Sequence, residues 1–567
     1  MNRSRLFARA RRRACAVLLS AAAPALAGGA PFSVVEASIA EMQQALTEGR
    51  VTARQLVEQS LLRIALYEER LNAVIAVDPS ALEQADARDA ERREGRLRGP
   101  LHGIPVAVKD NIHTTGMPTT GGALAFAGLM APYEATLVTN LRAAGAIVLA
   151  KTQMTELANW VAGPPGMPTN YCSLTGYGFN PYDPRRDPRP DLADGRPALA
   201  TGGSSSGAGT AASFWAANVG TETSGSILSP ANANRLAAIK PTVGRVSRHG
   251  ILPITADQDT AGPMARSVAD AALLLGVLEG AAPDSEDPAT SRCPRETDYT
   301  RYLDRGALAG ARIGIPRAYF YDRVTPPGAT EPQGGLDEAQ AVVMAAAIEA
   351  LERAGAVIVD PADIPSVVDP DPRENFLLWP ICRGLDEAKA KGCSISFAYG
   401  MERDFNRWLA SLGAAAPVAS LSGLRAWNRE HERAGTLKYG QALLDFSDAM
   451  DLEAWRTRYE TDRAKDVRLA GAHGIDEVMA RERLDALLFP GPRGANLAAR
   501  PGYPTVIVPF GATPPDADPP FPPGFDPAPV PLGVAFTGTA CSEPRLIALA
   551  YAFEQATRAR TPPPGLP

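Results

Sequence analysis

Two segments of this chain repeat one helix–glycine–strand unit, and this repeat limits the fold more than any other feature. The first unit is RAAGAIVLA at residues 142–150, and the second is RAGAVIVD at residues 353–360. In each unit an alanine-rich helical segment ends at a glycine, a common helix terminator, and a short apolar run follows. Further apolar runs at 484–489, 505–508 and 532–536 are predicted strands. Helices that alternate with apolar strands predict an α/β fold, in which helices cover a sheet.

Two turns of small residues, at 201–207 and 220–226, are the candidate functional segments. Glycine permits a close backbone approach and positive φ, and serine supplies a nucleophilic hydroxyl. The alanine-rich segment between the turns predicts a short helix, which would bring Ser204 and Ser226 together. A flexible Gly/Ser linker is the simplest alternative. The apolar run at 210–217 argues against it, because linkers do not carry core residues.

Three chemical interpretations compete for these turns. A phosphate-binding loop requires a lysine in a GxxxxGK[ST] pattern, and no lysine follows Gly207 or Gly209. Residues 203–207 fit a GxSxG nucleophile elbow with Ser205 as the nucleophile, but the strand and the acid–histidine pair that an elbow needs are not recognisable. The third interpretation is a Ser–Ser–Lys hydrolase, which requires a lysine that can be neutral.

Residues 103–111 provide such a lysine. They form a short apolar strand that ends in Lys109. A lysine at the end of a buried strand is desolvated, which lowers its pKa and makes it a usable base. The alternative is a lysine that emerges from the strand end into solvent.

Four motifs together resemble the amidase signature family. They are GIPVAVKDNI from residue 103, GGSSSGAG from residue 202, GTETSGSILSPA from residue 220 and KPTVGRVSRHGILPITADQDTAGPMARSVADAALLL from residue 240. The resemblance extends over residues 38–557 and is strongest to the exported, peptide-amidase-like branch. It implies one large α/β domain at residues 31–562, with a mixed, twisted β-sheet covered by helices on both faces. Residues 375–470 would form a helical region on the substrate side.

The resemblance also implies a catalytic triad. Matching the motifs assigns the base to Lys109, the proton relay to Ser204 and the nucleophile to Ser226. The segment between the two serines is slightly shorter than is usual in the family, so the choice between Ser204 and Ser205 as the relay stays open.

An oxyanion hole is implied at the second turn. Backbone N–H groups at Thr223, Ser224 and Gly225, next to Ser226, would bind the developing negative charge. Ser224 departs from the family pattern, because glycine or aspartate is usual at its position. The reaction implied is hydrolysis of a carboxamide, with C-terminal peptide amides among the candidate substrates.

Residues 1–27 are predicted to be a secretory signal peptide. A basic segment precedes an apolar one, and Ala25-Leu26-Ala27 fits an A-x-A cleavage site. The arginines at 11–13 leave a twin-arginine route open. An exported, periplasmic or extracellular protein is therefore expected, without stable membrane insertion after cleavage. Five cysteines lie beyond this segment, and of these Cys382 and Cys393 are close enough to pair in an oxidising compartment.

Composition restricts the partners. The net charge of −6 and the lack of basic clusters beyond the N-terminus argue against nucleic-acid binding. The expected partner is a small-molecule or peptide amide, and neither a cofactor nor a metal is expected. The main alternative function is an amidase-like subunit of a tRNA-dependent amidotransferase, working in the cytoplasm. A catalytically inactive family member that serves as a binding protein is a further alternative.

Overall fold

The computed structural model describes residues 32–164, 166–192, 194–203 and 207–566. Residues 34–567 form one compact unit. The predicted signal peptide at residues 1–27 lies outside the described residues. Within the part of the chain that is described, no helix is both long and apolar enough to cross a membrane.

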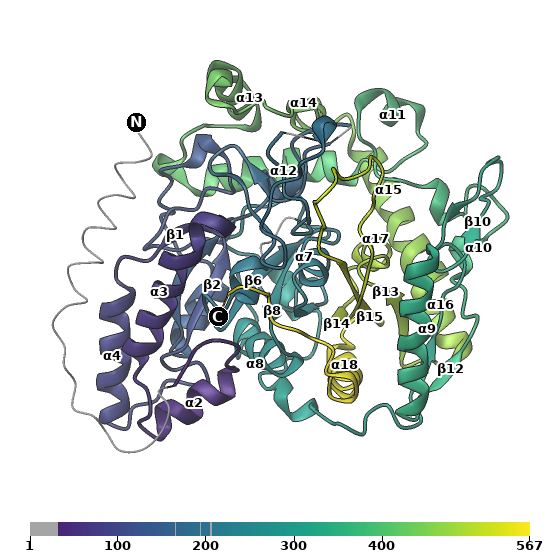
Figure 1. The fold of residues 1–567 in the computed structure, drawn as a ribbon. Coiled ribbons are helices and arrows are strands. Elements are labelled where there is room, and N and C mark those ends of the chain that lie inside the picture. The colour runs from purple at the N-terminus through teal and green to yellow at the C-terminus, as the bar shows by residue number, and fades with distance from the viewer. Residues whose placement is uncertain (1–31, 165, 193, 204–206, 567) are drawn as a thin grey trace. The chain divides into compact units, whose positions relative to one another are not determined.

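A mixed sheet of eleven strands, counted over the described residues, is the centre of this unit (Figure 1). Its strands, in spatial order, are β1 (Val74–Val77), β3 (Ile147–Thr152), β2 (Pro105–Lys109), β6 (Ala217–Glu222), β8 (Thr260–Ala265), β7 (Ala237–Lys240), β14 (Thr505–Thr513), β15 (Val530–Thr537), β13 (Ala486–Pro490), β9 (Arg312–Gly314) and β12 (Val357–Val359). Strand β2 is parallel to both β3 and β6, whereas β6 is antiparallel to β8. Two short hairpins, β4–β5 (Tyr171–Cys172 and Gly176–Tyr177) and β10–β11 (Arg323–Val324 and Gln333–Gly334), lie apart from this sheet.

Helices cover both faces of the sheet, which confirms the α/β class. The helices of the first half are α2 (Ile39–Thr47), α3 (Ala53–Leu71), α4 (Ala81–Arg93), α5 (Thr136–Ala143), α6 (Ala208–Ala211), α7 (Leu228–Ala233) and α8 (Val268–Glu279). Those of the second half are α9 (Glu338–Arg353), α10 (Pro365–Val368), α11 (Leu385–Ala390), α12 (Ser396–Ser411), α13 (Leu421–Glu430), α14 (Ala442–Asp448), α15 (Arg456–Val467), α16 (Asp476–Glu482), α17 (Ala495–Ala499) and α18 (Glu543–Thr557). Helix α18 packs against both α8 and α9, and α7 packs against β7, β14 and β15.

Both helix–glycine–strand units are present as predicted. Helix α5 is followed by Gly145 at φ +88° and then by β3, and α9 is followed by Gly355 at φ +91° and then by β12. A side chain is strained at such positive φ values, and glycine is not. The glycines therefore allow the chain to leave each helix and enter the sheet at once.

The helix predicted between the two small-residue turns is mostly wrong. Helix α6 is only one turn long, and the chain then enters the sheet as β6. Every residue of β6 is buried, and the strand pairs with β2 on one side and with β8 on the other. Burial on both faces removes the regular alternation of apolar and polar residues that marks a half-buried strand, so periodicity alone does not identify β6 as a strand.

The predicted helical region contains α12 to α15 and packs around aromatic side chains. Phe397, Phe405 and Trp408 are buried in one apolar cluster with Trp160 from the first half of the chain. The rings of Trp160 and Phe397 meet edge to face, with their centroids 5.1 Å apart. Residues far apart in sequence therefore form a shared core beside the candidate site.

Two disulfides are formed in the described chain. Cys382 pairs with Cys393, as predicted from their spacing, and Cys293 pairs with Cys541 over a separation of 248 residues. Cys172 is free and buried.

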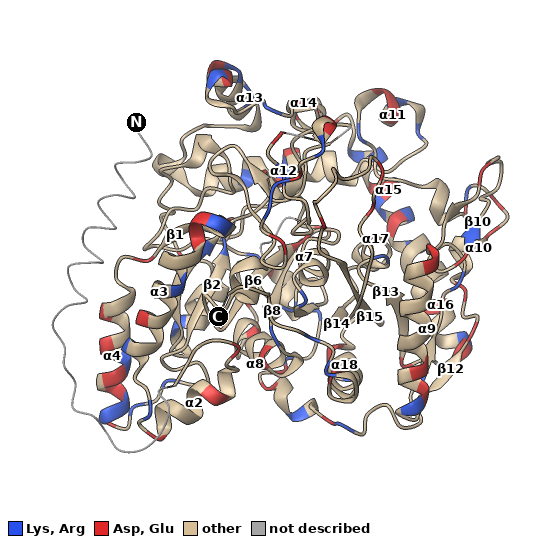
Figure 2. Ribbon diagram, in the orientation of Figure 1, with Lys and Arg blue, Asp and Glu red and all other residues tan. Residues whose placement is uncertain are grey.

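Charged side chains of both signs are intermixed on the outer helices. Figure 2 shows acidic and basic residues side by side along α4.

Candidate active site

Lys109 is the last residue of β2, and its side chain is fully buried. Its Nζ donates hydrogen bonds to Thr221 Oγ1 at 2.7 Å and to the Thr221 carbonyl oxygen at 3.2 Å. Burial lowers the pKa of Lys109 to about 7, although the carboxylates of Asp259 and Glu222 act in the opposite direction. Near neutral pH a large fraction of this amine is therefore unprotonated and able to accept a proton.

Parallel pairing of β2 and β6 brings the predicted residues to one edge of the sheet. Val108 pairs with Val219, so the carboxyl ends of both strands lie side by side. Ligands of open α/β sheets bind at such carboxyl ends. Thr221 and the turn that contains Ser226 follow on β6, next to the end of the lysine strand.

The second turn leads from β6 into α7. The Glu222 carboxylate accepts hydrogen bonds from the backbone N–H groups of Ile227, at 2.7 Å, and Leu228, at 3.0 Å. It thereby fixes the start of α7 directly after Ser226. Gly225 has φ +92°, a value that favours glycine, and this allows the sharp bend before the serine.

Backbone N–H groups in this turn are free to bind a ligand. Ser224, Gly225 and Ser226 are half-buried and line a cavity. Among the described residues, their three N–H groups have no intramolecular acceptor. Donors of this kind, aimed at a reacting carbonyl, stabilise an oxyanion.

Two glycines of the first turn lie against Ser226. A Cβ atom added to Gly203 would lie 3.0 Å from Ser226 Cα, and one added to Gly202 would overlap the backbone of Ser229. Gly203 also donates its N–H to Ser229 Oγ at 3.3 Å. The first and second turns therefore meet, as the small residues predict. The predicted relay Ser204, the alternative Ser205 and Ser206 lie outside the described residues.

Thr223 is held by the segment before β8. Its hydroxyl donates to the Asp259 carboxylate, and its carbonyl oxygen accepts from Gln258 Nε2 at 3.1 Å. Asp259 also accepts the N–H groups of Ile254, at 2.9 Å, and Thr255, at 3.0 Å. Burial raises the pKa of Asp259 to about 7. These hydrogen bonds together fix the first residue of the predicted oxyanion hole.

The cavity at Ser226 has a volume of about 590 Å³. One part of its lining is apolar and aromatic and includes Trp160, Phe397 and Ile381. Its polar lining outside the two turns comprises Asn159, Ser229, Arg383 and Asn496. Phe397, an aromatic residue of the predicted helical region, therefore lines the candidate substrate cavity.

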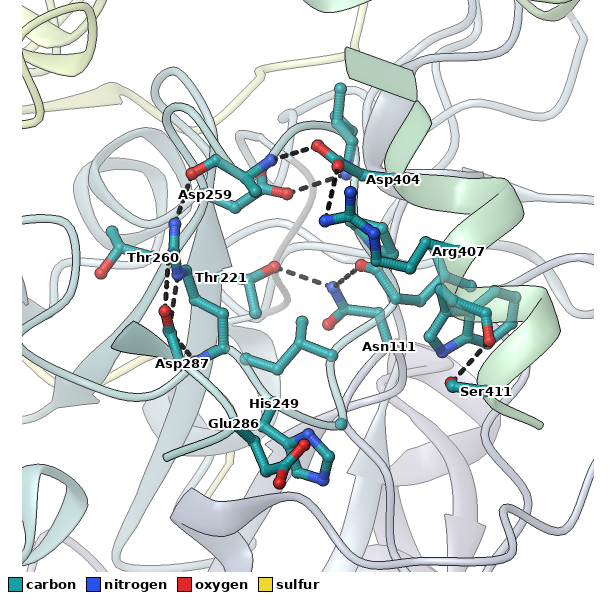
Figure 3. A pocket seen from close by; sticks show the side chains of 18 of the residues that line it. Asn111, Thr221, His249, Asp259, Thr260, Glu286, Asp287, Asp404, Arg407 and Ser411 are labelled. Carbon is teal, nitrogen blue, oxygen red and sulfur yellow. Dashed lines mark hydrogen bonds and ion pairs between the residues drawn. The ribbon is translucent and has the colours of Figure 1, made fainter. Parts of the chain in front are cut away.

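A second cavity, of about 400 Å³, shares part of its lining with the first, and Figure 3 shows its side chains. Thr223 and Ile254 line both cavities, and the second one extends to Asn111 and Thr221. Asn111 Nδ2 donates to Thr221 Oγ1 at 3.1 Å, as Figure 3 shows. The Thr221 hydroxyl oxygen therefore accepts hydrogen bonds from both Lys109 and Asn111.

Sequence patterns did not identify Thr221, Asp259 or Arg383 as residues of the site. Thr221 and Asp259 lie inside motifs that carry the family resemblance, but nothing in their local pattern assigns them a contact. Arg383 follows directly on Cys382, and the predicted disulfide was the only signal near it.

Comparisons with known proteins agree with this site. The Amidase family model matches residues 55–547. A probable amidase of Arabidopsis thaliana is 32% identical over 94% of this chain and 92% of its own length. The solved structure of native peptide amidase from Stenotrophomonas maltophilia is 37% identical, with a TM-score of 0.76 over 94% of this chain and 99% of that one. One subunit of the glutamyl-tRNA(Gln) amidotransferase from Synechococcus sp. (strain WH7803) is 31% identical over 92% of this chain and 97% of its own length.

The fold, the cavity and these relatives define the protein as an amide hydrolase. It belongs to the amidase signature family.

Proposed function

We propose that this protein hydrolyses carboxamides through a triad of Lys109, Ser204 and Ser226. Lys109 Nζ, in its neutral form, takes the hydroxyl proton of Ser204, which in turn takes that of Ser226. Ser226 Oγ then attacks the amide carbonyl carbon and forms a tetrahedral intermediate. Its oxyanion is bound by the N–H groups of the turn that begins at Thr223 and continues through Ser224 and Gly225.

Collapse of the intermediate breaks the C–N bond and leaves an ester between Ser226 and the acyl group. The departing ammonia or amine takes up the proton that passes back through Ser204. Water then attacks the ester carbonyl and gives up its proton along the same relay. This step releases the carboxylic acid and restores the Ser226 hydroxyl.

One observation carries this proposal: a fully buried lysine with a pKa of about 7 lies at the strand end beside the turn that contains Ser226. Burial of a charged ammonium costs free energy, and this cost favours the neutral amine. Lys109 is hydrogen-bonded to a neutral hydroxyl and a carbonyl oxygen of Thr221. A lysine in this setting is suited to accept a proton.

C-terminal peptide amides are the proposed substrates. Support comes from the 37% identity to peptide amidase over almost the whole of both chains and from a cavity large enough for a peptide end. The alternative, a component of an amidotransferase, draws support from the Synechococcus relative. We favour the free amidase because the sequence also carries a candidate export signal.

Export to the periplasm or the medium is part of the proposal. Two disulfides support it, since such bonds are rare in reducing compartments. We propose a small-molecule or peptide amide as the partner. We propose neither nucleic-acid binding nor stable membrane insertion.

The test is ammonia release from three substrate classes: C-terminally amidated peptides, aliphatic amides and aryl amides. Purified protein should release ammonia fastest from the peptide amides, and the Ser226→Ala variant should release none. A protein that hydrolyses none of the three classes would contradict the proposed function.

A further inference from the structure

One arginine, Arg383, lines the cavity at Ser226. Arg383 is exposed, and among the described residues its guanidinium forms no ion pair with a carboxylate. Its Cζ lies 5.7 Å from the centroid of the Trp160 ring. No aspartate or glutamate is among the described residues that line this cavity. The backbone N–H of Arg383 donates to Glu387 Oε2 at 2.7 Å, and Glu387 is not part of the cavity lining.

The loop that carries Arg383 is fixed at its base. The Cys382–Cys393 disulfide closes it, with the two Cα atoms 5.1 Å apart. Next to the disulfide, Cys382 N–H donates to the Ser394 carbonyl oxygen at 2.9 Å, and Ser394 N–H donates to the Pro380 carbonyl oxygen at 2.8 Å. Pro380 and Ile381, on the same segment, also line the cavity. The arginine is therefore presented to the substrate space by a constrained loop.

An uncompensated positive charge in a cavity favours an anionic ligand. Guanidinium binds a carboxylate through two parallel hydrogen bonds, and such charge-assisted bonds are stronger than neutral ones. The apolar surface of Trp160, Phe397 and Ile381 beside it suits the hydrocarbon part of the same ligand.

We propose that Arg383 is a specificity-determining residue that binds a carboxylate on the acyl portion of the amide substrate. This inference rests on the proposed function, because it requires an amide to occupy the cavity at Ser226. The substrate class that it names is acidic amides, such as peptide amides that carry glutamate or aspartate near the amidated end.

Three peptide amides that differ at one residue near the amidated end test the inference. That residue is Glu, Gln or Lys, and the rest of the peptide is unchanged. For the wild type, kcat/KM should be about tenfold higher with Glu than with Gln, as expected for a charge-assisted hydrogen bond, and lowest with Lys. Added salt should reduce the advantage of the Glu peptide and leave the Gln peptide unchanged.

Variants of Arg383 test whether this residue causes the preference for the Glu peptide. Arg383→Gln should equalise the Glu and Gln peptides, and Arg383→Glu should make the Lys peptide the best of the three. Lys389→Gln is the matched control, because Lys389 is an exposed cation on the same disulfide loop that does not line the cavity. It should keep the wild-type preference.

Three outcomes overturn the inference, and they separate the role of Arg383 from the proposed function. If the wild type hydrolyses all three peptides equally well, or if Arg383→Gln keeps the preference for Glu, the role of Arg383 is wrong while amide hydrolysis stands. If no peptide amide is hydrolysed, the proposed peptide-amide substrate is wrong and the inference fails with it. The salt dependence of the wild type tests the inference even if both Arg383 variants fold poorly.

Discussion

Lys109 and Thr221 lie on neighbouring parallel strands and are joined by a hydrogen bond of 2.7 Å between Nζ and Oγ1. This bond links the buried amine to the strand that continues into the turn of Ser226. The lysine and the proposed nucleophile are therefore positioned by the same pair of strands. Changes at either end of this link should alter both the rate and the pH dependence of hydrolysis.

Activity should rise with pH through about 7. Since burial lowers the pKa of Lys109 to about 7, raising the pH converts the ammonium to the amine that can accept a proton. Below that value kcat/KM should fall by about tenfold per pH unit, and above it kcat/KM should level off. Lys109→Ala should fold and lose most turnover. Lys109→Arg should be equally inactive because guanidinium stays protonated. Full activity in Lys109→Arg would show that the lysine is structural.

Thr221→Val should slow the enzyme and move its pH profile. Valine keeps the shape of the side chain but removes the oxygen that accepts from Lys109 and Asn111. Loss of an acceptor destabilises the ammonium, so the pKa of Lys109 should fall and the acidic limb of the profile should move to lower pH. We expect a loss of about tenfold in kcat.

A buried threonine elsewhere in the sheet serves as the control. Thr505 lies on β14, and its hydroxyl shares a hydrogen bond of 2.9 Å with that of Thr537. Thr505→Val should reduce thermal stability and leave the pH profile of kcat/KM unchanged. An unmoved profile in Thr221→Val would contradict the link between Thr221 and the base.

Gly203→Ala should impair catalysis because the two turns are in close contact. The added Cβ would lie 3.0 Å from Ser226 Cα and 3.3 Å from the Gly225 carbonyl oxygen, closer than ordinary van der Waals contact. The turns must separate slightly, and small displacements of reacting groups cost about 100-fold in rate. Gly128→Ala is the control, since a Cβ there meets nothing within 4 Å. Equal kcat values for the two variants would show that the contact has no catalytic consequence.

Export should be visible at the N-terminus of the protein recovered from cells. The basic and apolar segments followed by Ala25-Leu26-Ala27 predict cleavage near Ala27. N-terminal sequencing of the protein from the periplasm or medium should give a sequence that begins near Gly28. An intact Met1 on soluble cytoplasmic protein would contradict export and favour the amidotransferase alternative.

Local sequence was enough to predict several parts of the fold and the site. The helix–glycine–strand units, the strand that ends in Lys109 and the close contact of the two small-residue turns all depend on short-range patterns. Glycines that end a helix or form a tight turn, and short apolar runs that form strands, can be recognised in the sequence itself. The Cys382–Cys393 disulfide could likewise be predicted, because the two cysteines are close in sequence.

Other parts depend on contacts that no local pattern reveals. Asp259 contacts Thr223 only because β6 and β8 pair with Glu222 opposite Thr260. Strand β6 was not predicted: its first residues were assigned to the helical segment between the two turns and its last residues to the second turn. Arg383 reaches the cavity through the packing of a loop far away in the sequence. Register and loop packing decide these positions.

Variants of the two adjacent serines, Ser204 and Ser205, should show which of them is the proton relay. Ser204→Ala should slow acylation by several orders of magnitude, since the proton relay is lost while the nucleophile remains. Ser205→Ala should have a milder effect. The reverse order of the two would assign the relay to Ser205.

The most direct measurement of the central claim is the mass of the peptide that carries the covalent intermediate. A fluorophosphonate or a slow amide substrate should label the enzyme once, and peptide mapping by mass spectrometry should place the label on the peptide that contains Ser226. Ser226→Ala should abolish both labelling and turnover. A label on the peptide that contains Ser205, or full activity in Ser226→Ala, would contradict the account.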